Sequence, residues 1–139
     1  MIFSSKLKTT DQNLKALKMS EITAEKIKNF IFDKDNGFLI KYHNKEGIDL
    51  VLLDELYEIL ERLKEDWKNK KEVPKDILYY LMLIVPGLYD DLELYRGDEV
   101  QHYTYEEMIY YLSTAIEMCL HPTPDDNPHF NTPLKELGN

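Results

Sequence analysis

The sequence is poor in the residues that small proteins commonly use to build disulfides, metal sites and phosphate-binding loops. Its 139 residues include one cysteine and five glycines. A single cysteine cannot form an internal disulfide, and it excludes a zinc site built from several cysteines. The glycines are scattered and do not form a glycine-rich loop that could hold a phosphate group. These absences argue against several common classes of catalytic and cofactor-binding site.

Long hydrophobic runs are also absent. The longest apolar stretch runs from Ile77 to Val85 and resumes after Pro86 as far as Leu88. It is far shorter than the roughly 20 residues that cross a bilayer. The N-terminus shows no basic start followed by an apolar segment, so we expect no secretory signal. Together with the single cysteine, this favours a reducing, cytoplasmic setting.

Positive charge is scarce in the second half of the chain. The whole sequence has 17 basic and 26 acidic residues, a net charge of −9. After Lys75, twelve acidic residues face only Arg96 and Lys135. Such a surface repels phosphate backbones, which disfavours direct nucleic-acid binding, and it attracts a basic protein partner. The simpler alternative is that the acidic balance only maintains solubility.

Hydrophobic residues make up 43% of the chain, which is enough for one packed core. Apolar residues at helical spacing predict helices over residues 53–67, 77–85 and 105–119, with 77–85 at the centre of the core. Thr104 and Glu107 have the spacing of a capping box at the start of the last of these helices.

We expect a mainly α fold, a single-domain helical bundle of four to five helices over residues 1–121. A proline-rich, extended tail should follow over residues 122–139. A small β-hairpin around residues 29–43 is one alternative, because an Asn-Gly pair between apolar runs is typical of hairpin turns with positive φ. The other alternative, slightly favoured by composition, is a helix through Phe32, a turn and a short strand at Phe38–Tyr42. A second strand at 48–52 would then follow.

Three short patterns resemble metal sites, and each lacks ligands. Residues 33–37 resemble the start of an EF-hand loop, but the glycine comes one residue early and Asn44 occupies the position of the bidentate glutamate. Glu99 and His102 have the spacing of a di-iron pair without the second pair that such sites need. Cys119, His121 and His129 could together ligate zinc, but Cys119 is better explained as a buried cysteine in the last helical turn. We therefore predict no metal and no cofactor.

Two pairs of carboxylates, Glu55-x-x-Glu58 and Asp90-x-x-Glu93, allow an enzymatic alternative. They resemble the paired acidic elements with which all-α nucleotide pyrophosphatases of the MazG kind hold Mg²⁺. The resemblance implies a metal-dependent enzyme acting on nucleotides, with these four residues at its metal site. The basic residues that such an enzyme needs near the phosphates are missing after Lys75.

The segment from Tyr89 to Glu107 interleaves acidic residues with tyrosines. Tyrosine is an amphipathic anchor that recurs in interface hot spots, and carboxylates around it complement a surface rich in arginine and lysine. We therefore predict a partner-binding site here. Its expected residues are Tyr89, Asp90, Asp91, Glu93, Tyr95, Asp98, Glu99, Tyr103, Tyr105 and Glu106. The alternative for each tyrosine is a half-buried structural position.

These features predict a binding module without catalytic residues. Small, acidic, tyrosine-bearing domains are typical of immunity proteins of bacterial toxin systems and of inhibitors that mimic nucleic acid. The expected partner is a basic toxin or nuclease, whose substrate groove the acidic surface would occlude. A third hypothesis is a scaffold domain or homodimer, which would associate through exposed tyrosines at positions 79, 80, 110 and 111.

Overall fold

The computed structural model describes residues 21–122 of the chain. This part of the protein contains five α-helices, one short 3₁₀ helix and no β-strand. In chain order the elements are α2 (Ala24–Phe32), α3 (Phe38–His43), α4 (Leu50–Trp67), α5 (Lys75–Asp91), the 3₁₀ helix η1 (Leu92–Tyr95) and α6 (Glu99–Leu120). The predicted mainly α bundle is therefore confirmed. The predicted tail lies, apart from Pro122, outside the described residues.

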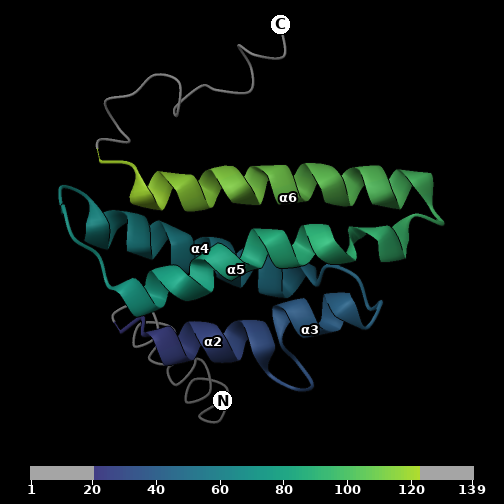
Figure 1. Cartoon of the computed structure of the whole chain (residues 1–139), viewed down its shortest axis with the longest axis horizontal. Helices are drawn as coiled ribbons and strands as arrows, with labels where there is room; N and C mark the ends of the chain where they lie inside the picture. The colour runs from purple at the N-terminus through teal and green to yellow at the C-terminus, as the bar shows by residue number, and fades with distance from the viewer. Residues whose placement is uncertain (1–20, 123–139) are drawn as a thin grey trace, which may run out of the picture.

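The helices are arranged in layers with α5 at the centre (Figure 1). α6 runs along one edge, α2 and α3 follow the opposite edge, and α5 crosses in front of α4 between them. α5 contacts α2, α3, α6 and η1, while α4 packs against α6. Leu81 and Ile84 of α5 have no exposed surface. The segment 77–85 is therefore the centre of the core, as its apolar composition predicted.

The central helix is longer than the predicted segment 77–85 and continues past Pro86. α5 continues to Asp91, and Pro86 lies on its exposed side. Proline lacks an N–H, so the carbonyl oxygen of Met82 loses its hydrogen-bond donor within the helix. Because this side of α5 is exposed, water can donate to that carbonyl instead. Although α5 is strongly apolar, no helix between residues 21 and 122 combines the length and hydropathy of a membrane span.

The turn between α2 and α3 is built by an aspartate side chain. Asp33 Oδ2 accepts hydrogen bonds from the backbone N–H groups of Asp35 and Asn36, at 3.2 and 2.9 Å. Gly37 has a φ of −64°, so this turn does not use the positive φ of a hairpin. The glycine is needed for space, because a Cβ there would lie 2.5 Å from the carbonyl oxygen of Ile31.

Both strands expected near this turn are wrong. Residues 38–42 belong to α3, where Phe38, Leu39 and Tyr42 are buried on one face of a short helix. Residues 50–52 open α4, whose N-cap Asp49 accepts hydrogen bonds from two backbone N–H groups of its first turn. The expected helix through Phe32 and the turn after it are confirmed.

α6 begins five residues before its predicted capping box. Asp98 is the N-cap, and its side chain accepts a hydrogen bond from the backbone N–H of Gln101 at 3.0 Å. The apolar face that the helical period predicts here, which includes Ile109, Leu112 and Ile116, is buried. The earlier start adds a full turn of exposed surface to the N-terminal end of α6.

Candidate protein-binding site

Two of the predicted anchor tyrosines are structural. Tyr95 is only 6% exposed and stacks on Tyr42, with ring centroids 4.7 Å apart. Its hydroxyl donates to the carbonyl oxygen of Tyr42 at 2.5 Å and accepts from the backbone N–H of Gly47 at 3.0 Å. Tyr95 therefore holds a loop residue at positive φ, Gly47, and is not available to a partner. The interpretation of Tyr95 as a surface anchor is wrong, because its ring lies inside the core.

Tyr105 is half-buried in the same cluster. Its ring packs edge-on against Tyr95, with centroids 5.1 Å apart. Its hydroxyl accepts hydrogen bonds from the backbone N–H of Ile48 and from the side-chain amide of Gln101, both at 3.3 Å. Tyr105 therefore ties the N-terminal part of α6 to the loop that precedes α4.

Several of the predicted acidic residues are engaged locally. Arg96 donates two hydrogen bonds to Glu93, at 2.7 and 2.5 Å, and these lower the pKa of the Glu93 carboxyl. Asp91 lies 3.0 Å from Nδ1 of His43. Asp98 caps α6. Fewer of these carboxylates are therefore free to bind a partner than the sequence suggests.

The remaining predicted residues on α6 belong to its solvent-exposed side. This helix carries no lysine or arginine. Together, its exposed residues form what we call the α6 outer face. They are Glu99, Val100, Tyr103, Thr104, Glu106, Glu107, Tyr110, Tyr111 and Glu117. Tyr89 and Asp90 are also exposed, but they lie on α5 and outside this face.

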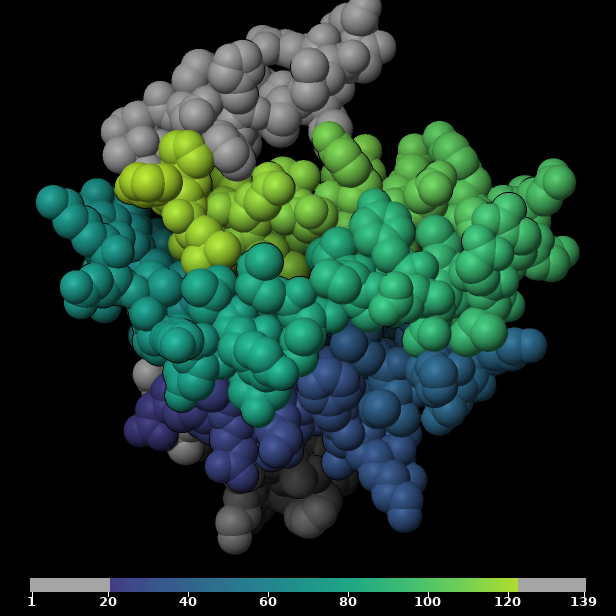
Figure 2. All heavy atoms as spheres, viewed as in Figure 1, coloured from purple at the N-terminus to yellow at the C-terminus, as the bar shows by residue number. Residues whose placement is uncertain are grey.

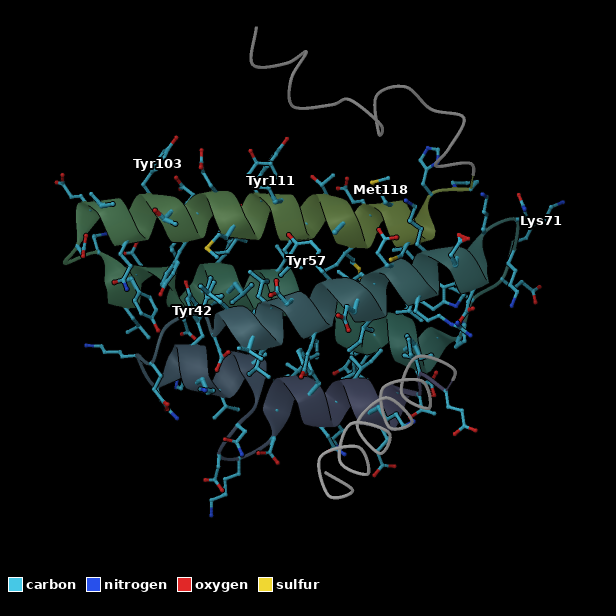
Figure 3. All side chains as sticks on the ribbon, turned by 180° about the vertical axis from the view of Figure 1, so that it is seen from behind. Tyr42, Tyr57, Lys71, Tyr103, Tyr111 and Met118 are labelled. Atoms are coloured by element: carbon cyan, nitrogen blue, oxygen red, sulfur yellow. The ribbon has the colours of Figure 1, made fainter. Side chains whose placement is uncertain are left out.

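Tyrosines and glutamates alternate along the α6 outer face. Tyr103 and Tyr111 point away from the bundle (Figure 3). The Tyr103 hydroxyl donates to Glu107 Oε1 at 2.9 Å, and this contact raises the pKa of Tyr103. Glu106, Glu107, Tyr110 and Tyr111 line a shallow pocket of about 270 Å³. The helix therefore presents aromatic rings and carboxylates around one surface depression.

This pocket has the chemistry that recognises a guanidinium group. Carboxylates bind arginine through charge-assisted and often bidentate hydrogen bonds. Aromatic rings stack on the planar guanidinium, which is more weakly hydrated than an ammonium group. Glu106 and Glu107 supply the first interaction, and Tyr110 and Tyr111 supply the second. The pocket can therefore receive an arginine side chain from another protein.

The candidate metal ligands do not come together. Within residues 21–122, no group of three or more histidine, cysteine, aspartate or glutamate side chains is placed to hold a metal ion. The pair Glu55 and Glu58 lies on α4, whereas Asp90 and Glu93 lie at the end of α5 and in η1. Nothing in this arrangement supports the Mg²⁺ site of the enzymatic alternative.

Cys119 is not placed for nucleophilic chemistry. It is buried, and its Sγ donates to the carbonyl oxygen of Leu60 at 3.1 Å. Burial raises the pKa of the Cys119 thiol to about 12. A reactive cysteine needs the opposite shift, because the thiolate is the nucleophile.

Comparison with protein-family models, with curated proteins and with solved structures finds no match for this chain. The site therefore stands on its own geometry. The predicted residue set omitted Glu107, Tyr110 and Tyr111, which the structure adds. Extending the helical period i, i+4, i+7 from Tyr103 reaches Glu107 and Tyr110, so the pattern for finding them was present in the sequence.

Proposed function

We propose that the chain is an inhibitory protein-binding module that docks on a basic partner through the α6 outer face. In this proposal it acts in the cytoplasm in the manner of an immunity protein or antitoxin. The partner is a basic toxin or nuclease. Inhibition follows from occlusion, because the glutamates of α6 occupy the positive groove that would otherwise hold a phosphate backbone.

The observation that carries the proposal is the pocket lined by Glu106, Glu107, Tyr110 and Tyr111. Tyrosine and arginine dominate the binding energy of protein interfaces and tend to pair across them. The Tyr103–Glu107 hydrogen bond holds two neighbouring side chains in place before binding, which reduces the entropy that binding would cost. An arginine of the partner seated in this pocket is the expected centre of the interface.

The charge of α6 supports the same proposal. Its four glutamates, Glu99, Glu106, Glu107 and Glu117, are all exposed, and the helix has no lysine or arginine to oppose them. A field of one sign speeds the encounter with a partner of the opposite sign, and salt screens this effect. We therefore expect rapid association that slows as ionic strength rises.

The test uses the products of the open reading frames that adjoin the gene for this chain. Each is expressed alone and together with the chain, and growth and binding are measured. We expect one product to be basic and toxic, and to be neutralised by the wild-type chain. The double variant Glu106→Lys, Glu107→Lys should bind at least tenfold more weakly and lose protection.

A matched control is available on α4. Glu55→Lys combined with Glu65→Lys makes the same change in net charge at exposed positions of another helix. This control should bind within about twofold of wild type. The proposal is wrong if none of the neighbouring products is bound, or if both double variants lose affinity equally.

A further inference from the structure

A regular stripe of exposed residues follows the solvent side of α5 into η1. Its members are spaced alternately four and three residues apart, which is the period of a helix–helix seam. Three of them are large side chains with high exposure: Tyr79 at 59%, Met82 at 56% and Tyr89 at 45%. The complete stripe is Lys75, Tyr79, Met82, Pro86, Tyr89 and Glu93.

The helix that carries this stripe crosses the middle of one face of the molecule (Figure 2). The atoms of α5 cross the centre of that face, between α6 on one side and α2 with α3 on the other (Figure 2). Exposed apolar side chains that occur singly need no explanation, but a contiguous stripe of them marks an interaction site. The α5 stripe is therefore a second surface, separate from the α6 outer face.

The two ends of the stripe carry opposite charges. Lys75 stands at the N-terminal end of α5, near the exposed Lys70 and Lys71 of the preceding loop. Glu93 stands at the other end, where Asp90 is also exposed; Arg96 already pairs with Glu93 there, so Lys75 of a second copy would join that pair. Figure 3 shows Lys71 and Tyr103 at opposite ends of the molecule. A partner with the same stripe in the reverse direction would match both ends.

We propose that the α5 stripe binds a second copy of this chain, with the two α5 helices antiparallel and related by a two-fold axis that passes between them, midway between Met82 and Pro86. The stripe is symmetric about that point. Lys75 then faces Glu93 of the second copy, Tyr79 faces Tyr89, and Met82 faces Pro86. In a parallel pair like charges would meet at both ends, which is unfavourable.

The surface at the N-terminal end of the stripe fits this register. A shallow pocket of about 570 Å³ lies there, lined by Lys75, Asp76, Tyr79 and Tyr80. The antiparallel arrangement brings Tyr89 and Glu93 of the second copy to this pocket. The tyrosine ring meets two other rings, and the carboxylate meets the Lys75 ammonium.

The size of the stripe sets the strength of the association. α5 has 17 residues and is about 25 Å long. A contact along one side of this single helix buries less area than a typical stable interface, which covers roughly 800 Å² per partner. We therefore expect a dimer that dissociates on dilution, with a dissociation constant in the micromolar range or weaker.

The first test is sedimentation equilibrium of the full chain between about 5 and 500 μM. We expect wild type to pass from monomer to dimer across this range. Met82→Glu places a charge beside the two-fold axis and should raise the dissociation constant at least tenfold. Tyr103→Glu on α6 is the control and should dimerise as wild type does. A strict monomer at the highest concentration overturns the proposal.

The second test fixes the register without relying on a destabilising change. Tyr79→Cys and Tyr89→Cys proteins are mixed and oxidised. The antiparallel pair should give the mixed disulfide, whereas two Tyr79→Cys chains should not cross-link. Their Cα atoms would be roughly 15 Å apart along the helices, well beyond the ~7 Å limit for a disulfide. Efficient cross-linking of Tyr79→Cys to itself would contradict the antiparallel arrangement.

Discussion

Two stacked tyrosines in the core differ in whether their hydroxyl groups have partners. The Tyr95 hydroxyl makes two hydrogen bonds, to the carbonyl oxygen of Tyr42 and from the N–H of Gly47. The Tyr42 hydroxyl is buried and has no hydrogen-bond partner within residues 21–122. A buried polar group without a partner costs free energy, while one that satisfies buried backbone groups stabilises the fold.

This contrast gives a matched pair of predictions. Tyr95→Phe should lower the free energy of unfolding by about 1–3 kcal/mol, because it leaves the buried N–H of Gly47 without its partner and removes one of the two hydrogen bonds to the carbonyl oxygen of Tyr42, which keeps the N–H of Lys45. Tyr42→Phe should leave stability unchanged within about 0.5 kcal/mol or raise it. Urea denaturation followed by circular dichroism measures both. Equal losses in the two variants would contradict the assigned hydrogen bonds.

A second prediction at this scale concerns Cys119, the only thiol in the chain. Because burial raises its pKa to about 12, almost no thiolate is present at pH 8. Alkylation by iodoacetamide should therefore be at least 100-fold slower than for a free cysteine, and should become fast in denaturant. Thr104→Cys, an exposed position on α6, is the control and should add one rapidly labelled thiol.

Single residues also explain where sequence reasoning failed. Asn36 and Gly37 form a strong hairpin pattern, because both tolerate a positive φ. In the structure the Asp33 side chain accepts hydrogen bonds from the next turn of backbone N–H groups, and neither residue adopts a positive φ. Composition cannot reveal that Gly37 is required by the close approach of the Ile31 carbonyl. That requirement exists only once α2 and α3 have packed together.

At the scale of elements, α4 depends on a charged cap. Lys41 Nζ lies 2.6 Å from Asp49 Oδ2, which joins α3 to the start of α4. This contact and the backbone N–H groups of Leu52 and Val51 lower the pKa of Asp49 below its ordinary value of 3.8. A lowered folded-state pKa means that the stabilisation is present above about pH 4 and is lost as the pH falls through the folded value.

Asp49→Asn tests this linkage, because asparagine also caps helices well while carrying no charge. We expect the variant to be about 0.5–1 kcal/mol less stable than wild type at pH 6. The difference should shrink as the pH falls below 4, which chemical denaturation at a series of pH values measures. Lys41→Gln should give a similar loss, and the double variant should add little, since both changes remove the same ion pair.

The elements with one clear apolar face were predicted best. α4 was expected over 53–67 and occupies Leu50–Trp67. The prediction is close because only one face of this helix is apolar, which gives a clear helical period. In α6 the helical period places Ile109 on the apolar face and Tyr110 off it, and both placements agree with the structure. Packing against α4 and α5 buries Ile109 while leaving Tyr110 46% exposed.

At the scale of the molecule, the two proposed surfaces should act independently. The α6 outer face and the α5 stripe share no residue, so a change in one should leave the other intact. Met82→Glu should weaken dimerisation at least tenfold and still bind a basic partner with wild-type affinity. Glu106→Lys with Glu107→Lys should weaken partner binding and still dimerise. Isothermal calorimetry and sedimentation on the same samples check both outcomes, and loss of both activities in either variant would contradict the separation.

The charge imbalance after Lys75 predicts an acidic surface in the second half of the chain, where the exposed glutamates of α6 lie. The sequence could not show that Arg96 binds Glu93, or that Asp98 caps a helix, because both depend on local folding. The acidic residues left exposed on α6 form no ion pair with another side chain within residues 21–122.

The absence of basic residues from α6 also decides which reagents can detect its contacts. No lysine or arginine occurs between Arg96 and Lys135. Trypsin therefore leaves this whole stretch as one long peptide, and amine-reactive cross-linkers have no attachment point on the helix. A carbodiimide, which couples carboxylates to the lysines of a bound protein, together with chymotrypsin, which cleaves after tyrosine, would map a partner where the usual reagents show nothing.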